Sequence, residues 1–374
     1  MLKMMSKLSV MLSGIVLTLS ACAMETAPNY TITAMLGNQY DNNMAYLFDC
    51  DTDEKVDSVI VSDGVAKFEG HVGTPRMTRV IIGETRGSVV VMEQGEINIS
   101  ADGMPSGTPL NDKYVAVVKR LSEIVDESRS LNRNDSVQEA RYRELLTEYD
   151  ALPSKAYEEN RDNVVGRYMY VLSAIDKPLS QITADMSANP ILASSAALKS
   201  ICNNKRIQIE TGEGKRYKDF TVEYDGKTET FSSYIKPGHY TLVDFWASWC
   251  GPCVRQLKVI KELYAKYKDK GLDVVGVAVW DKPEDTFEAI KKHDLQWPCI
   301  VNAQTIPTDL YGIEGIPCIL LINPDGIIVS RGKQGSNLVN DVDEAMAAFE
   351  SVKSEAAQTN PSITAQPADT IAAF

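Results

Sequence analysis

Two cysteines, Cys250 and Cys253, are separated by two residues and follow an apolar run. Residues 240–246 predict a buried strand and residues 254–270 predict a helix, so the pair lies where a strand passes into a helix. The free N–H groups and the positive dipole end of a helix N-terminus stabilise a thiolate. We therefore expect Cys250 to have a lowered pKa and to attack disulfides. Cys253, one turn further along, would resolve the mixed disulfide.

The same spacing also occurs in zinc sites and in structural disulfides. A zinc site would need a second cysteine pair or a histidine pair at ligand spacing, and His71, His239 and His293 are scattered singly. A structural disulfide would not require the strand-to-helix context. The sequence therefore favours redox chemistry and predicts neither a metal nor a cofactor.

Residues 243–253 read Val-Asp-Phe-Trp-Ala-Ser-Trp-Cys-Gly-Pro-Cys and resemble the active-site signature of the thioredoxin superfamily. The resemblance implies an α/β thioredoxin fold for residues 214–353. A second landmark is Pro317, which follows Tyr-Gly-Ile-Glu-Gly-Ile. In the family this proline is cis and faces the dithiol. The substrate-binding residues that we expect are Trp249, Gly251, Pro252, Ile316 and Pro317.

Asp244 lies on the predicted strand, six residues before Cys250. The proteins that it resembles bury an acid here that shuttles protons for the inner cysteine. A carboxyl among apolar neighbours has a raised pKa, which suits general acid/base work on Cys253. The alternative is an ion-paired structural aspartate. The sequence departs from the family at Gly276, where thioredoxin itself has a lysine near this acid, so we expect the proton relay to differ in detail.

The other cysteines of the mature chain are Cys50, Cys202, Cys299 and Cys318. Cys299 and Cys318 stand in apolar runs and are expected to be small buried hydrophobic residues. A bridge between Cys50 and Cys202 would cross the predicted domains, and spacing alone leaves it open.

The N-terminus predicts export. Lysines precede an apolar stretch at residues 8–19, which is too short to span a bilayer and is typical of a secretory signal. The stretch ends in Leu-Ser-Ala-Cys, which resembles a bacterial lipobox. The resemblance implies a signal peptide at residues 1–21, a lipidated Cys22 and a tether at residues 22–29. An ordinary signal peptide with a chance cysteine is the alternative. The lipid would hold the protein to a membrane face on the periplasmic side of the cell envelope.

The chain has 374 residues, of which 44% are hydrophobic, and carries a net charge of −13. It has no basic stripe that could neutralise phosphates, so nucleic-acid binding is not expected. Short β-rich runs separated by turn residues predict a small all-β, sandwich-like domain at residues 30–104. Apolar residues at helical spacing predict a helical subdomain at residues 108–203. Residues 354–374, rich in Ala, Thr, Pro and Ser, predict a disordered tail.

The predicted reaction is thiol–disulfide exchange. Gly-Pro between the cysteines is the dipeptide of thioredoxin, whose potential is about −270 mV, against about −120 mV for the oxidase DsbA. The dipeptide therefore favours a reductant. An extra helix and strand between residues 279 and 310 resemble the insert of membrane-tethered reductases of the TlpA and ResA kind. This resemblance implies a membrane electron conduit as donor and oxidised envelope proteins as substrates, including apocytochromes before haem attachment.

Other functions stay open. A disulfide isomerase or oxidase could use the same dithiol, with two copies brought together by the N-terminal domain. The β-rich domain could instead be a glycan- or protein-binding module, with the thioredoxin-like domain as its redox sensor. A thiol peroxidase is disfavoured, because its motif would need threonine in place of Ala247 and proline in place of Val243.

Overall fold

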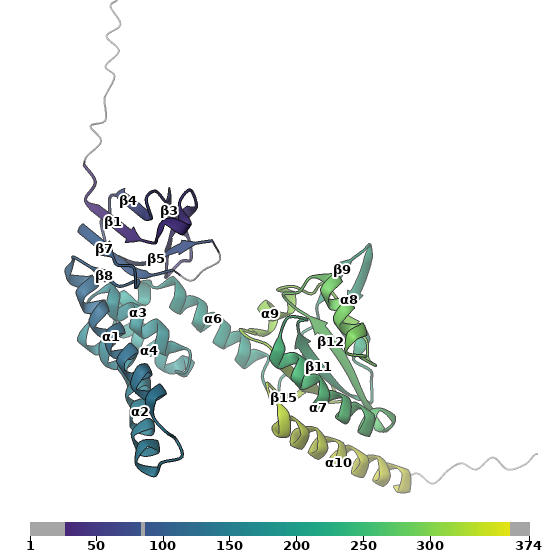
Figure 1. The fold of residues 1–374 in the computed structure, drawn as a ribbon. Coiled ribbons are helices and arrows are strands. Elements are labelled where there is room, and N and C mark those ends of the chain that lie inside the picture. The colour runs from purple at the N-terminus through teal and green to yellow at the C-terminus, as the bar shows by residue number, and fades with distance from the viewer. Residues whose placement is uncertain (1–26, 84–86, 360–374) are drawn as a thin grey trace, which may run out of the picture. The chain divides into compact units, whose positions relative to one another are not determined.

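The structure is a computed structural model that describes residues 27–83 and 87–359. It forms two compact units that divide between Tyr170 and Val171 (Figure 1). The predicted signal peptide and Cys22 lie outside the described residues. Within the described ranges, none of the helices combines the length and the apolar character needed to cross a bilayer.

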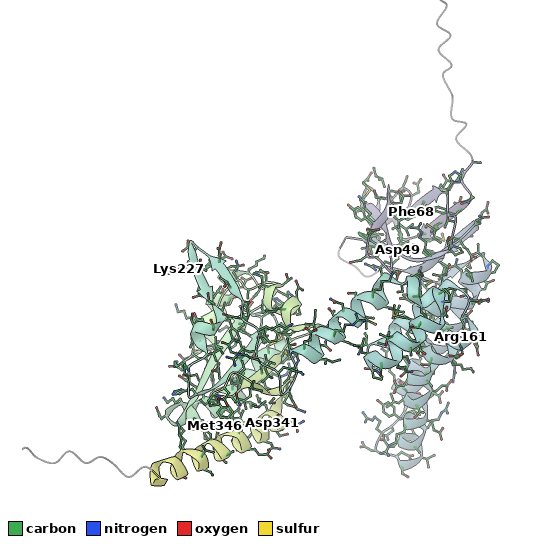
Figure 2. All side chains as sticks on the ribbon, turned by 180° about the vertical axis from the view of Figure 1, so that it is seen from behind. Asp49, Phe68, Arg161, Lys227, Asp341 and Met346 are labelled. Carbon is green, nitrogen blue, oxygen red and sulfur yellow. A yellow bond between two sulfur atoms is a disulfide. The ribbon has the colours of Figure 1, made fainter. Side chains whose placement is uncertain are left out.

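The first unit begins with two antiparallel-rich sheets that pack face to face. One sheet has the order β4-β1-β7-β8 and the other β3-β2-β5-β6. Buried residues alternate along β1 and β2, because each sheet has one face in a shared core. That core joins Ile32 and Phe68 of one sheet to Leu47 and Val80 of the other. Phe68 is labelled in Figure 2. The predicted β-sandwich is thus confirmed. The strands are β1 (Tyr30–Met35), β2 (Met44–Asp49), β3 (Lys55–Ile60), β4 (Val65–Gly70), β5 (Arg76–Ile82), β6 (Val89–Met92), β7 (Gly95–Ile99) and β8 (Pro105–Ser106), with a 3₁₀ turn at Asn38–Tyr40.

Helices α1 (Pro109–Ser130), α2 (Ser136–Glu159) and α3 (Val164–Ala174) follow the sandwich. The Asp135 side chain caps α2 by accepting from the N–H groups of Val137 and Gln138, at 2.9 and 3.0 Å. Arg120 of α1 and Glu148 of α2 form a bidentate pair at 2.7 and 2.8 Å. Apolar residues of α1 and α3 pack on Met77 and Val91 of the sandwich. The first unit therefore joins α1, α2 and the first part of α3 to the β-sheets.

Helices α4 (Leu179–Ala188), α5 (Pro190–Ser194) and α6 (Ala196–Glu210) belong to the second unit. We predicted one helical subdomain at residues 108–203, so the structure divides that region differently. The physical reason is that α6 continues beyond residue 203 and bonds to the thioredoxin-like domain. The Thr211 hydroxyl, at its C-terminus, donates to Tyr311 O at 3.2 Å, and Arg331 donates to Thr211 O at 2.9 Å.

The second unit is built on one five-stranded sheet with the order β13-β12-β11-β14-β15. The central strand β11 runs parallel to β12 and antiparallel to β14, and six of its seven residues are buried because both faces are covered. Helices α7 and α10 pack on one face, where α10 contributes Met346 (Figure 2). This sheet confirms the predicted thioredoxin fold. The elements are β9 (Thr221–Tyr224), β10 (Lys227–Thr230), β11 (Tyr240–Trp246), α7 (Gly251–Tyr267), β12 (Leu272–Ala278), α8 (Pro283–Lys292), β13 (Cys299–Ile300), α9 (Ile306–Tyr311), β14 (Cys318–Ile322), β15 (Ile328–Arg331) and α10 (Gly335–Thr359), with 3₁₀ turns at Phe231–Tyr234 and Lys268–Lys270.

Two further segments bear on the sequence predictions. Helix α8 and strand β13 confirm the extra helix and strand between residues 279 and 310.

The predicted disordered tail began at residue 354, but α10 continues through Thr359, so this boundary was wrong. Residues 355–358 read Glu-Ala-Ala-Gln, which are strong helix formers, and the first proline comes only at Pro361. The remainder of the predicted tail lies outside the described residues.

Candidate active site

The two predicted redox cysteines lie where β11 passes into α7. Cys250 and Cys253 form a disulfide, with their Cα atoms 5.2 Å apart. Cys250 is the N-cap of α7, and its sulfur accepts from the N–H of Cys253 at 3.2 Å. Pro252 stands in the first turn, where its missing N–H leaves no hydrogen bond unmade. Cys250 keeps 3% of its surface exposed and Cys253 keeps none, so of the two only Cys250 has any exposed surface.

The predicted cis-proline loop lies against this disulfide. The Ile316–Pro317 peptide bond is cis, as the family resemblance implied. The carbonyl oxygen of Ile316 is 3.7 Å from the sulfur of Cys250, although the two residues are 66 positions apart in the chain. Ile316 also packs on the apolar cluster that contains both cysteines and Trp246. The fold therefore brings together the two segments that the sequence could not place relative to each other.

Side chains of helix α6 form hydrogen bonds to the segment that precedes the cis-proline. The Gln208 side-chain amide donates to Gly312 O at 2.7 Å, and that of Asn204 donates to Glu314 at 3.0 Å. Gly312 has a φ of 62°, and a Cβ there would lie 2.9 Å from Asn204 O, so the close approach requires glycine. Sequence analysis missed Asn204 and Gln208. They are ordinary amides on a helix outside the thioredoxin signature, and no pattern marks them.

The residues before Cys250 are held by the corner that precedes α8. Asp281 accepts from the N–H and the hydroxyl of Ser248, both at 2.8 Å, and from the Thr286 hydroxyl at 2.8 Å. The indole N–H of Trp249 donates to Trp280 O at 2.9 Å. Trp249 nevertheless remains 62% exposed beside Cys250. Sequence analysis missed Asp281, although an aspartate two residues before Pro283 is a usual signal for a helix start.

Asp281→Ala is expected to lower the free energy of unfolding by about 2 kcal/mol, because Ser248 and Thr286 lose a charged acceptor. It is also expected to raise the KM for a protein disulfide, because Ser248, the residue before Trp249, is no longer held, while reaction with a small disulfide is unchanged. Urea unfolding and steady-state kinetics measure the two effects. Asp281→Asn, which keeps one acceptor oxygen, serves as the control. An alanine variant as stable as the parent protein would contradict this role.

Asp244 is buried beneath the dithiol, with 1% of its surface exposed. Neither carboxyl oxygen has a hydrogen-bond partner among the described residues. Desolvation raises the pKa of this carboxyl to about 7. The alternative of an ion-paired structural aspartate is therefore wrong for the described structure. Asp244 pairs with Gly276 across the β11–β12 register, as the sequence alignment with the family predicted.

The other cysteines of the described residues, Cys50, Cys202, Cys299 and Cys318, are free thiols. Burial raises the pKa of Cys318 to about 11 and that of Cys299 to about 12, which keeps both thiols protonated near neutral pH. In the part of the chain that the structure describes, no group of three or more His, Cys, Asp or Glu residues could hold a metal ion.

A disulfide at a helix N-terminus, a cis-proline loop against it and a thioredoxin-type sheet beneath it define a thiol–disulfide oxidoreductase. Comparison with known proteins agrees. Residues 214–331 match the model of the AhpC/TSA family. Residues 30–114 match a domain of unknown function, DUF4369.

Curated relatives of this chain include thiol-disulfide oxidoreductases named ResA. ResA of Bacillus cereus is 28% identical over 130 residues, which cover 34% of this chain and 72% of that relative. ResA of Bacillus subtilis is 24% identical over 131 residues, which cover 34% of this chain and 73% of that relative.

Similar solved structures include the thioredoxin domain of a thiol-disulfide oxidoreductase from Bacteroides vulgatus. It is 28% identical, with a TM-score of 0.32, and covers 36% of this chain and 96% of that one. A thiol:disulfide interchange protein from Bacteroides sp. is 27% identical, with a TM-score of 0.33, and covers 37% of this chain and 92% of that one.

Proposed function

We propose that this protein is a reductase of protein disulfides in the bacterial cell envelope. The observation that carries the proposal is the Cys250–Cys253 pair at the start of α7, with the cis-proline loop 3.7 Å from the outer sulfur. The Gly-Pro dipeptide between the cysteines favours the reducing direction. Relatives named thiol-disulfide oxidoreductases support the reaction class.

In the proposed reaction the thiolate of Cys250 attacks a substrate disulfide, forms a mixed disulfide and expels one substrate thiolate. The thiol of Cys253 then loses its proton to Asp244 and attacks the sulfur of Cys250. This second step releases the other substrate thiolate and closes the Cys250–Cys253 disulfide. Two electrons pass to the substrate, and a donor dithiol must return them before the next cycle.

Substrate recognition is assigned to the surface around Cys250. Trp249 offers an exposed aromatic face. The carbonyl oxygen of Ile316 lies 3.7 Å from the sulfur of Cys250. We assign the backbone of Ile316 and the ring of Pro317 to contact with an extended substrate strand, while Gly251 and Pro252 add no bulky side chain at the helix start. An extended peptide that carries a disulfide fits this surface best.

We further propose that the chain is exported and that lipid on Cys22 anchors it to a membrane on the periplasmic side. A membrane electron conduit would supply the electrons, and oxidised envelope proteins, apocytochromes among them, would receive them. The basis is the N-terminal apolar stretch and its Leu-Ser-Ala-Cys ending. Labelling with a radioactive fatty acid tests the anchor, since Cys22→Ser should abolish incorporation.

The direction of electron flow is tested by the reduction potential of the Cys250–Cys253 pair. The protein lacking residues 1–22 is equilibrated in thiol buffers, and the fluorescence of Trp246 and Trp249 reports its oxidation state. We expect a potential near or below about −270 mV, the value of thioredoxin. A potential near about −120 mV would instead indicate an oxidase or an isomerase.

A further inference from the structure

The buried acid needs a route by which its proton reaches water. This inference rests on the proposed function, in which Asp244 takes a proton from Cys253 and also follows the pH of the solvent, so that its proton must exchange with water. The dithiol side is closed, because Cys253 has no exposed surface and Cys250 only 3%. Asp244 itself is 1% exposed, and neither of its carboxyl oxygens has a partner among the described residues. The proton must therefore leave on another side.

The neighbouring strand β12 has no side chain next to Asp244, because the residue at that position is Gly276. The two residues are partners in the parallel β11–β12 register, and neighbouring strands lie about 4.8 Å apart. A Cβ on Gly276 would lie 2.7 Å from the sulfur of Cys299 and 3.1 Å from the indole nitrogen of Trp246. The absence of a side chain at this position thus lets two polar atoms gather beside the acid. The indole nitrogen, like the carboxyl, has no hydrogen-bond partner among the described residues.

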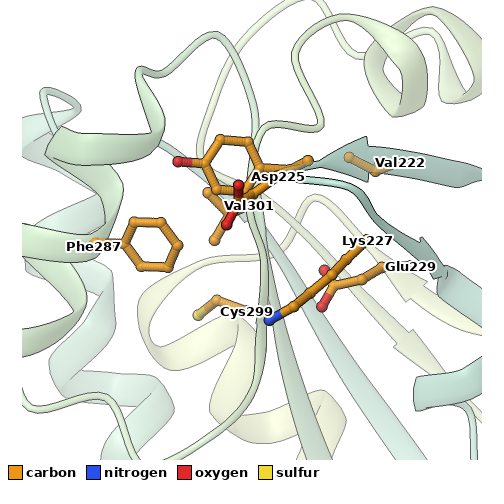
Figure 3. Close-up of a pocket in the computed structure, with 8 residues that line it drawn as sticks. Val222, Asp225, Lys227, Glu229, Phe287, Cys299 and Val301 are labelled. Atoms are coloured by element: carbon orange, nitrogen blue, oxygen red, sulfur yellow. The ribbon is translucent and has the colours of Figure 1, made fainter.

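Cys299 is also one of the residues that line a cavity. It lies on β13, the edge strand of the sheet, and pairs with Gly276. A cavity of about 290 Å³ lies between the β9–β10 hairpin and α8, and Cys299, Glu229 and Phe287 line it (Figure 3). Lys227, at the start of β10, also lines this cavity and is exposed to solvent. Cys299 therefore separates the buried acid from a space that opens to water.

The charges around the thiol suit a neutral proton carrier. Burial, followed by the Asp244 carboxylate, raises the pKa of Cys299 to about 12, and Glu229 adds to this effect. Tyr234 donates to Glu229 at 3.3 Å, and Cys318 of β14 is the other thiol whose pKa the Asp244 carboxylate raises. Cys299 thus keeps its proton near neutral pH, which makes it a hydrogen-bond donor rather than a nucleophile.

We propose that Cys299 is a positioning residue that passes the proton of Asp244 to the cavity between the β9–β10 hairpin and α8. In the proposed step the Asp244 carboxyl first moves into hydrogen-bond contact with the thiol, and the sulfur then accepts its proton while the S–H proton leaves to water in the cavity. One proton enters and one leaves, and no sulfur changes its oxidation state. Reversal of the same exchange reloads the acid.

The test compares Cys299→Val, which removes the S–H group, with Cys299→Ser, which keeps a proton on a smaller side chain. The carboxyl band of Asp244 is followed by infrared spectroscopy in the full protein and is assigned by its loss in Asp244→Asn. Two rates are measured: the hydrogen–deuterium exchange of this carboxyl, and the resolution of the mixed disulfide as a function of pH. We expect Cys299→Val to lower both rates by about tenfold. This is less than the 10²–10⁴-fold effect on rate that a general acid or base itself contributes. Cys299→Ser should stay close to the parent protein.

Cys318→Val is the matched control, because it also removes a thiol whose pKa the Asp244 carboxylate raises, and Cys318 does not line the cavity. It should leave the exchange rate unchanged. If valine is not accommodated at position 299, Cys299→Ala removes the same proton without added bulk. Equal slowing by valine and serine would indicate a packing effect and overturn the proposal, as would exchange that no Cys299 variant alters.

The two levels of the proposal can fail separately. The infrared exchange of Asp244 needs no protein substrate. If the protein does not reduce protein disulfides but the exchange still depends on Cys299, the proposed function fails and the proton route stands. If disulfide reduction is normal and the exchange ignores Cys299, only the proton route fails.

Discussion

Cys250→Ser is expected to abolish disulfide reduction, with a loss on the order of 10³-fold or more. A serine hydroxyl remains protonated at neutral pH and cannot replace the thiolate that starts the exchange. Cys253→Ser should behave differently, because Cys250 can still attack but nothing resolves the product. This variant should accumulate a mixed disulfide with its substrate, which mass spectrometry of the acid-quenched reaction detects as one added substrate chain.

The remaining thiols provide the internal control for this experiment. Burial raises the pKa of Cys299 and Cys318, so neither should capture substrate when Cys250 is intact or absent. The double variant Cys250→Ser/Cys253→Ser should therefore trap nothing. Capture of substrate by that double variant, or equal trapping by the two single variants, would contradict the assigned order of attack.

Asp244→Asn is expected to have opposite effects on activity and on stability. Loss of the proton acceptor should slow resolution of the mixed disulfide by about 10²-fold, the lower end of what a general base contributes. The parent protein should resolve faster as pH rises through about 7, where the Asp244 carboxyl ionises, and the variant should lose this rise. Stopped-flow measurement of Trp249 fluorescence across pH 5–9 checks both expectations.

The same carboxyl should make the parent protein less stable as pH rises. The pKa of Asp244 is about 7 in the folded protein, against an ordinary value of 3.8. Below about pH 4 both states hold the proton, so the group has no effect. Between about pH 4 and pH 7 the unfolded chain ionises while the folded protein keeps its proton, so the free energy of unfolding falls. Above pH 7 the loss is constant, at about 4 kcal/mol for about three pKa units.

Urea unfolding of oxidised protein at a series of pH values tests this linkage. We expect Asp244→Asn to remove most of the fall in stability between pH 4 and pH 7. Asp281→Asn provides a comparison at another buried aspartate, one whose carboxylate is fully hydrogen-bonded. A parent protein whose stability stays flat over this range would mean that Asp244 has a partner in solution.

The chemistry of the site was predictable from the sequence because its central parts are local. The strand, the Cys-Gly-Pro-Cys pair and the helix that it starts occupy residues 240–267, so apolar pattern and helix-end physics were enough to place them. The burial of Asp244 followed from its position in a strand whose neighbours are all apolar. The cis-proline loop was recognised through its resemblance to the thioredoxin superfamily.

The tertiary structure decided which distant residues meet at the site. Sheet order and strand register bring Ile316 to Cys250, and Cys299 to the open position at Gly276. The hydrogen bond from Ser248 to Asp281 and the one from Gln208 to the cis-proline loop also depend on how helices pack around the sheet. Sequence periodicity tells which face of an element is buried but not which partner covers it. The residues that we propose to react were therefore predictable from the sequence, and those that hold them in place only from the fold.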